Sequence, residues 1–285
     1  MTGPQHPAQR IVVRANGAEL EAFRGGEGDG PVVCAAHPAE PFGAETVELL
    51  AATAPRRVVC FNPRGIGGSA PAGAAPLEQM VDDIEAARRE LGSAPWTFWG
   101  MSGGGWLAMI YAHRCPEGLA GIIVESACLC FRERLGDPGC ALSPFFPAWR
   151  AILAGRGLVD EGSHAGPSSG DGTEWIDIDG VGQVFRWRGG PALLVSPAPV
   201  SSAMLRAMPI LWTFDARSWI GSVRVPALVI AGGADPVVPT ARVRAVHEAL
   251  AGSAFLVADG AGHVPTVERR ADVAAAVASF LGAET

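Results

Sequence analysis

The stretch Trp99-Gly100-Met101-Ser102-Gly103-Gly104-Gly105 decides the fold of this chain. It follows an apolar run, Trp96 to Trp99, that predicts a strand, and it precedes a run whose apolar spacing predicts a helix. A side chain held at a tight strand-to-helix turn needs small neighbours two positions away on each side, and Gly100 and Gly104 supply them. We therefore predict that Ser102 is a nucleophile presented at this turn, with an ordinary helix N-cap as the alternative interpretation.

A serine hydroxyl is a weak nucleophile until a base removes its proton, and that base needs a carboxylate to fix its tautomer. Among six histidines, His263 is the candidate base because it stands in a loop between the last predicted strand and the last predicted helix. Asp235 comes just past the end of another predicted strand and is the candidate carboxylate. Glu125, at the end of a third strand, and Asp259 remain alternative acids.

The positions of these residues along the chain favour one site. Ligands of open parallel sheets bind at the carboxyl ends of the strands, where Ser102, Asp235 and His263 would converge. Their order along the chain fits a serine hydrolase as well. Each partner also has a plainer interpretation, Asp235 as an Asp-Pro turn and His263 as a helix cap. The amide of Gly103, at the start of a helix, is the predicted donor to a developing oxyanion.

Short apolar runs alternate with amphipathic helices along most of the chain. Several of the runs contain no polar residue, as expected for parallel strands covered on both faces. Helical spacing is clearest between Pro76 and Gly92, after Pro239, and near the C-terminus. This alternation predicts an α/β fold. The predicted strand runs are Ile11–Val13, Val32–Ala36, Val58–Phe61, Trp96–Trp99, Ile122–Val124, Leu228–Ile230 and Phe255–Val257.

One segment, 127–222, interrupts this rhythm. It is rich in Pro, Gly and Trp, and it includes a low-complexity run between Ser163 and Gly172. A structureless loop of that length is uncommon in a compact domain, so we interpret the segment as an inserted cap, with a disordered linker as the alternative. The predicted core is therefore 1–126 together with 223–285.

Composition excludes several classes of protein. The formal charge of −7 gives no general field for nucleic acid, and all 22 basic residues are Arg, which excludes lysine-dependent cofactors and the lysine of phosphate-binding loops. No apolar run is long enough to span a membrane, and the N-terminus lacks a secretory pattern. We expect a cytoplasmic protein that uses no cofactor or metal, with its six cysteines reduced and mostly buried.

These motifs resemble those of the α/β-hydrolase family over the whole chain. The segment 61–69 resembles a turn of that family that follows the fourth strand, although Asn62 replaces the usual Asp and removes a possible salt bridge to Arg64. The resemblance implies a mostly parallel sheet of about eight strands, flanked by helices, with the cap inserted after the sixth strand.

His37-Pro38-Ala39-Glu40 is similar to the oxyanion loop of the same family, with Pro38 in place of the usual Gly. By position, the resemblance implies that the amide of Ala39 is the second oxyanion donor. It implies that His37 holds the loop in shape rather than serving as a base. Proline removes one donor from this loop and fixes its backbone.

The expected function is hydrolysis of an ester or thioester of a small, largely apolar acyl compound. Ser102 would attack, His263 would carry the proton and Asp235 would orient the imidazole. We expect the Trp-rich cap, together with Met101 and Trp106, to line an aromatic pocket.

Two other functions stay open. The first is an aminopeptidase or amidase of the proline-iminopeptidase type, whose substrate ammonium would need acidic cap residues such as Glu133, Glu161 or Glu174. The second is a binder, lyase or cyclase without hydrolytic activity. Labelling of Ser102 by a fluorophosphonate would argue against the second.

Overall fold

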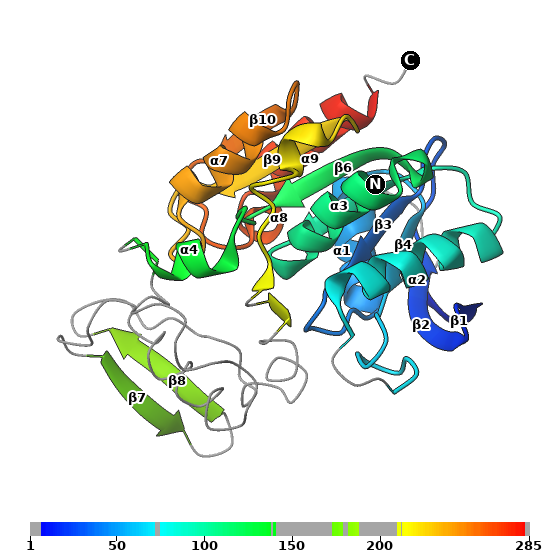
Figure 1. The fold of residues 1–285 in the computed structure, drawn as a ribbon, viewed down its shortest axis with the longest axis horizontal. Helices are drawn as coiled ribbons and strands as arrows, with labels where there is room; N and C mark the ends of the chain where they lie inside the picture. Colours follow the sequence, from blue (N-terminus) through cyan, green and yellow to red (C-terminus); the bar gives the residue numbers. More distant parts are fainter. Residues whose placement is uncertain are drawn as a thin grey trace.

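The computed structural model describes residues 7–71, 75–137, 139–140, 173–178, 182–187, 210–211 and 213–282. An eight-stranded sheet lies between helices on its two faces, which confirms the predicted α/β architecture (Figure 1). The strands of this sheet are β1 (Gln9–Ala15), β2 (Ala18–Gly25), β3 (Val33–Ala36), β4 (Val58–Phe61), β5 (Trp96–Met101), β6 (Leu119–Glu125), β9 (Ala227–Gly232) and β10 (Ala254–Ala258). The helices are α1 (Ala44–Thr53), α2 (Leu77–Glu90), α3 (Gly103–Arg114), η1 (Pro116–Gly118), α4 (Phe131–Leu135), η3 (Ile220–Ser222), α7 (Thr240–Ala249), α8 (Pro265–Glu268) and α9 (Arg270–Gly282).

The order of strands across the sheet is β1-β2-β4-β3-β5-β6-β9-β10. The pairs β1–β2 and β2–β4 are antiparallel, and every other neighbouring pair is parallel. The three strands that precede the predicted site residues, β5, β9 and β10, therefore run in the same direction. Their carboxyl ends lie along one edge of the sheet, where the predicted residues would meet.

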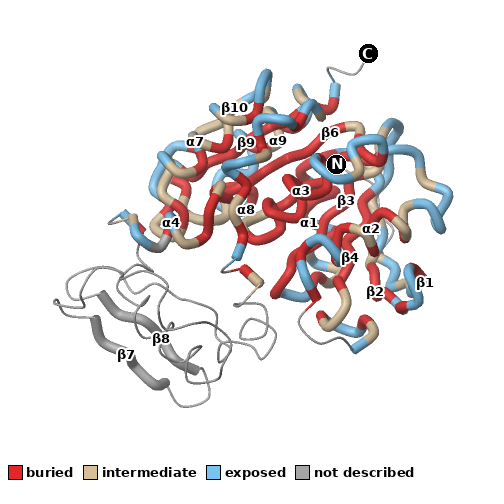
Figure 2. The backbone as a smooth tube through the Cα atoms, viewed as in Figure 1, coloured by how far each residue is buried: buried red, intermediate tan, exposed pale blue. Residues whose placement is uncertain are grey.

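The central strands are buried (Figure 2), and three of them, β3, β4 and β9, contain no polar residue. In β4, Val59 and Phe61 belong to the apolar core on one face, whereas Val58 and Cys60 belong to the core on the other. Because side chains alternate between the faces of a strand, a strand covered on both faces is apolar at most positions, and the buried Thr97 of β5 and Glu125 of β6 are exceptions.

Helices α2, α3 and α7 contribute to the core on one face, and α1 and α9 to the core on the other. Helix α2 coincides with the predicted helix after Pro76, and it ends at Glu90, two residues before Gly92, whose φ of 61° suits glycine. None of the helices in the described residues has the length and apolar character needed to cross a bilayer.

Most of the predicted cap lies outside the described residues. Within it, β7 (Thr173–Ile178) and β8 (Gly182–Trp187) pair as an antiparallel two-stranded sheet. Where the segment leaves and rejoins the core, two stretches that we call the neck, 129–131 and 214–216, run side by side. Cys130 and Asp215 form a β-bridge, and the amide of Ala216 donates to the carbonyl of Leu129 at 2.7 Å.

Candidate active site

Ser102 lies at a strained turn between β5 and α3. Its φ of 50° and ψ of −117° are rare for a residue with a side chain, so the surrounding contacts must hold this geometry. Gly100 explains part of the constraint, because a Cβ at this position would stand 2.1 Å from the carbonyl oxygen of Gly104. The turn therefore forms as predicted, and the small residues are needed for close backbone packing.

The carboxylate of Asp235 divides its two oxygens between different partners. Oδ1 accepts hydrogen bonds from the amides of Val237, at 2.7 Å, and Val238, at 3.0 Å. Oδ2 lies 2.9 Å from Nδ1 of His263, and the Asp235 side chain is fully buried. The Asp-Pro turn and the interaction with the histidine are thus two parts of one arrangement, in which the turn aims the carboxylate.

His263 connects Asp235 to Ser102. Its Nε2 lies 3.0 Å from Oγ of Ser102, on the ring edge opposite to the Asp235 contact. With its proton on Nδ1, the imidazole donates to Asp235 and leaves Nε2 free to accept a proton from the serine. The structure therefore brings together Ser102, His263 and Asp235, which are far apart in sequence.

Glu125, the alternative acid, does not contact His263 through a hydrogen bond. Both of its carboxylate oxygens accept hydrogen bonds from Trp99 or Thr266. Asp259, the other alternative, is exposed, and its backbone carbonyl accepts a hydrogen bond from Arg269. Of the three candidate carboxylates, Asp235 is the one that is hydrogen-bonded to the imidazole.

The loop 37–40 packs directly against the start of α3. A Cβ on Gly103 would lie 2.9 Å from Nε2 of His37 and 3.1 Å from Cγ of Pro38. Nδ1 of His37 accepts hydrogen bonds from the amides of Ala39, at 3.2 Å, and Glu40, at 3.0 Å. Burial lowers the pKa of His37, which favours the neutral ring that these contacts require. His37 thus binds the backbone of its own loop.

This arrangement bears differently on the two predicted oxyanion donors. The amide of Gly103 starts α3 beside Ser102, at a helix end where amides have no partner within the helix. The amide of Ala39 already donates to His37 and would have to give up that bond to reach an oxyanion.

Two residues that sequence reasoning did not single out hold the loop of His263. Glu268 accepts the amides of Gly262, at 2.7 Å, and Val264, at 3.0 Å. Thr266 is fully buried and binds Glu125. A carboxylate a few residues into a helix is a known capping signal and could have indicated Glu268, whereas no local pattern indicates Thr266.

Trp106 does not fit the expectation of a residue exposed to a pocket. It is 3% exposed, its Nε1 donates to the carbonyl of Cys128 at 3.0 Å, and its ring stacks on Phe214 with centroids 5.0 Å apart. Phe131 packs edge-on against the same indole. Phe131 and Phe214 both belong to the neck, so Trp106 acts as core that joins the neck to α3.

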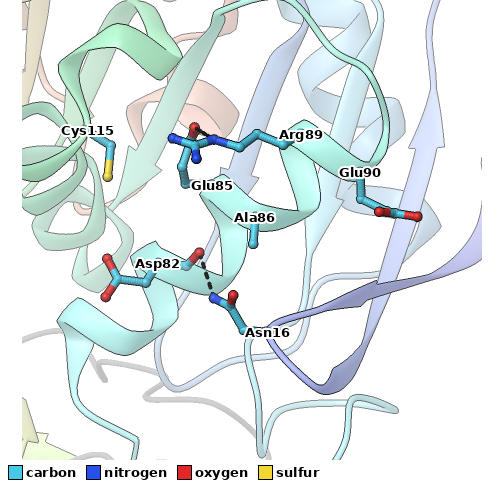
Figure 3. A pocket seen from close by; sticks show the side chains of 7 residues that line it. All are labelled: Asn16, Asp82, Glu85, Ala86, Arg89, Glu90 and Cys115. Atoms are coloured by element: carbon cyan, nitrogen blue, oxygen red, sulfur yellow. Dashed lines mark hydrogen bonds and ion pairs between the residues drawn. The ribbon is translucent and has the colours of Figure 1, made fainter.

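A separate surface pocket of about 490 Å³ lies along α2, at the end of α3 remote from Ser102 (Figure 3). The twelve residues of α3 separate the two places by about 18 Å. Cys115 lines this pocket, and burial raises its pKa, so the thiol is a poor nucleophile. The pocket lining offers no histidine near this thiol, and the candidate site remains the one around Ser102. The residues that line the pocket are Asn16, Asp82, Glu85, Ala86, Arg89, Glu90 and Cys115.

The chain is similar to known hydrolases in sequence and in structure. A model of the alpha/beta hydrolase family matches residues 30–276. The pimeloyl-[acyl-carrier protein] methyl ester esterase of Sodalis glossinidius is 27% identical over 219 residues, which are 76% of this chain and 79% of that protein. A proline iminopeptidase of Neisseria meningitidis is 35% identical over 77 residues, which are 26% of this chain and 25% of that protein.

Among solved structures, an alpha/beta fold family hydrolase from Bacillus anthracis aligns with a TM-score of 0.71 and 18% identity, covering 96% of this chain and 99% of the other. That similarity concerns the fold alone. Since the family model spans most of the sequence, the chain belongs to the alpha/beta hydrolase family.

Proposed function

We propose that this protein is a serine esterase that cleaves a carboxylic ester of a small, largely apolar acyl compound. The observation that carries the proposal is the pair of contacts made by His263, 2.9 Å to Asp235 and 3.0 Å to Ser102. These distances fall within hydrogen-bond reach, as a nucleophile, its base and the group that orients the base require.

The proposed mechanism follows from these contacts. Oγ of Ser102 attacks the ester carbonyl while Nε2 of His263 takes its proton, and Asp235 stabilises the imidazolium. His263 then protonates the leaving alcohol, and an acyl-enzyme remains on Ser102. Water, activated by the same histidine, releases the acid.

Oxyanion stabilisation is assigned to the amide of Gly103 and, as a second donor, to that of Ala39. Gly103 is favoured because it lies beside the nucleophile at a helix N-terminus, where the helix dipole also favours negative charge. Ala39 would exchange its bond to His37 for one to the oxyanion.

Ester chemistry is favoured over peptide chemistry by the extent of the similarities. The match to the esterase covers most of both chains, whereas the match to the iminopeptidase covers about a quarter of each. Glu133, one of the acidic residues considered for binding a substrate ammonium, forms ion pairs with Arg217 and Arg242. Its charge is therefore already balanced.

The test is a substrate panel applied to the wild type and to Ser102→Ala. We expect the wild type to hydrolyse short p-nitrophenyl esters and methyl esters of medium-chain acids faster than an aminoacyl arylamide. Ser102→Ala should reduce turnover by roughly 10⁶-fold. Ser93→Ala, in the turn after α2, is the control and should retain activity. A Ser102→Ala enzyme with near-wild-type turnover, or a preference for the arylamide, would contradict the proposal.

A further inference from the structure

Glu125 is a buried carboxyl group at the end of β6, and three donors converge on it. Oε1 accepts a hydrogen bond from the amide of Thr266 at 2.9 Å. Oε2 accepts hydrogen bonds from Oγ1 of Thr266 at 2.6 Å and from Nε1 of Trp99 at 2.9 Å. The residue has no exposed surface. Both of its oxygens therefore accept hydrogen bonds, from β5 and from α8, the short helix that follows His263.

The same residue also holds the nucleophile through its backbone. The carbonyl oxygen of Glu125 accepts the amide of Ser102 at 2.8 Å. Thr266, held by the side chain, stands three positions after His263. One residue of β6 thus binds the nucleophile through its backbone and, through its side chain, the short helix α8 that follows the base.

We propose that Glu125 is a positioning residue, whose carboxylate clamps Thr266 and thereby fixes the distance between Nε2 of His263 and Oγ of Ser102. This inference rests on the proposed esterase function. It assigns to Glu125 a role different from that of the acid on the imidazole, which Asp235 fills.

The three donors around Glu125 fit a glutamate side chain better than glutamine or aspartate. A glutamine in the same place would turn its NH₂ group toward Trp99 or toward the amide of Thr266, so a donor would face a donor. Aspartate is one methylene shorter and cannot reach both partners from the same backbone position. Burial raises the pKa of Glu125, against the effect of its hydrogen bonds, so protonation in acid would also weaken the clamp.

The experiment compares Glu125→Gln and Thr266→Val with Thr266→Ser and with Glu85→Gln. Glu85 is a buried carboxylate that binds Arg88, Arg89 and Tyr111, away from the site, so it controls for general destabilisation. We expect kcat to fall about 10- to 100-fold in Glu125→Gln and Thr266→Val, with KM changed less than about twofold, because a displacement near 1 Å costs this much.

Further outcomes separate positioning from stability. Thr266→Ser keeps the hydroxyl and should retain kcat within about threefold, and the double variant Glu125→Gln/Thr266→Val should lose little more than either single variant, since both break one clamp. Wild-type kcat in Glu125→Gln, or an equal loss in Glu85→Gln, would overturn the proposal.

A structural readout distinguishes failure of this inference from failure of the proposed function. A crystal structure of Glu125→Gln should show Nε2 of His263 beyond hydrogen-bond distance of Oγ of Ser102. If the wild type cleaves no ester, the esterase proposal fails, and this distance still tests the clamp. An unchanged distance overturns the clamp whatever the substrate is.

Discussion

Asp235 contacts His263 through Oδ2 alone, at 2.9 Å, because two backbone amides occupy its other oxygen. In Asp235→Asn the amide oxygen will take the place of Oδ1, where two donors await it, and the NH₂ group will face Nδ1. The imidazole must then accept a hydrogen bond at Nδ1, so its own proton lies on Nε2. In that tautomer Nε2 cannot take the proton of Ser102. We expect kcat to fall about 10⁴-fold with the fold retained, measured by ester turnover and circular dichroism. A loss below tenfold would contradict this assignment.

Gly103 has no room for a side chain between α3 and the His37 loop. A methyl group there would lie 2.9 Å from Nε2 of His37, and this neighbour belongs to a buried ring that cannot swing away. We expect Gly103→Ala to lower kcat by at least about tenfold through displacement of the proposed oxyanion donors. Gly221→Ala, where nothing lies within 4 Å of the new methyl group, is the matched control and should keep full activity.

Glu85 makes folding stability depend on pH. Burial raises its pKa, but hydrogen bonds from Arg88, Tyr111 and Arg89 outweigh burial and lower the pKa from 4.5 to about 2. A carboxylate whose pKa is lower in the folded state stabilises the fold above its unfolded value, and this contribution is lost as pH falls from about 5 toward 2. Urea unfolding should show Glu85→Gln to be less stable than wild type by roughly 2–3 kcal/mol at pH 7. The difference should shrink steadily below pH 5, and a constant difference would contradict the prediction.

Arg64 pairs with Asp83 of α2 in a two-pronged contact, Nε to Oδ2 at 2.6 Å and Nη2 to Oδ1 at 2.7 Å. The Asp83 side chain is fully buried, so Arg64→Met leaves an uncompensated charge. We expect a loss of about 3 kcal/mol in the free energy of unfolding. Arg14→Met, which removes an exposed pair with Glu19, should cost less than about 1 kcal/mol and serves as the control.

The same contact shows where the sequence was informative and where it was not. The replacement of the family Asp by Asn62 indicated that an interaction of Arg64 was missing, but the partner that Arg64 has instead, Asp83, lies on helix α2. Asn62 instead binds the backbone of Phe42 and the side chain of Glu21. Partners brought together by tertiary packing leave no periodic signal, so sequence reasoning could not name them.

The strands and the serine turn could be predicted because their signals are local. Apolar runs covered on both faces and glycines two positions from Ser102 depend on neighbours along the chain. In contrast, the sequence does not predict β2, because charged residues such as Glu19 and Arg24 interrupt the apolar pattern of this strand near the edge of the sheet. The contact between Glu125 and Thr266 joins residues 141 positions apart, and no local sequence pattern predicts it.

The neck bears on how the segment between its two stretches can vary in length. The two stretches 129–131 and 214–216 are hydrogen-bonded to each other, so the chain between them leaves and returns at one point of the core. The entropy of closing a loop rises only slowly with its length, so an insertion of another size can meet the same two ends at little cost. We therefore expect a segment of another length between these two stretches to be tolerated, with the sheet and the turn at Ser102 unchanged.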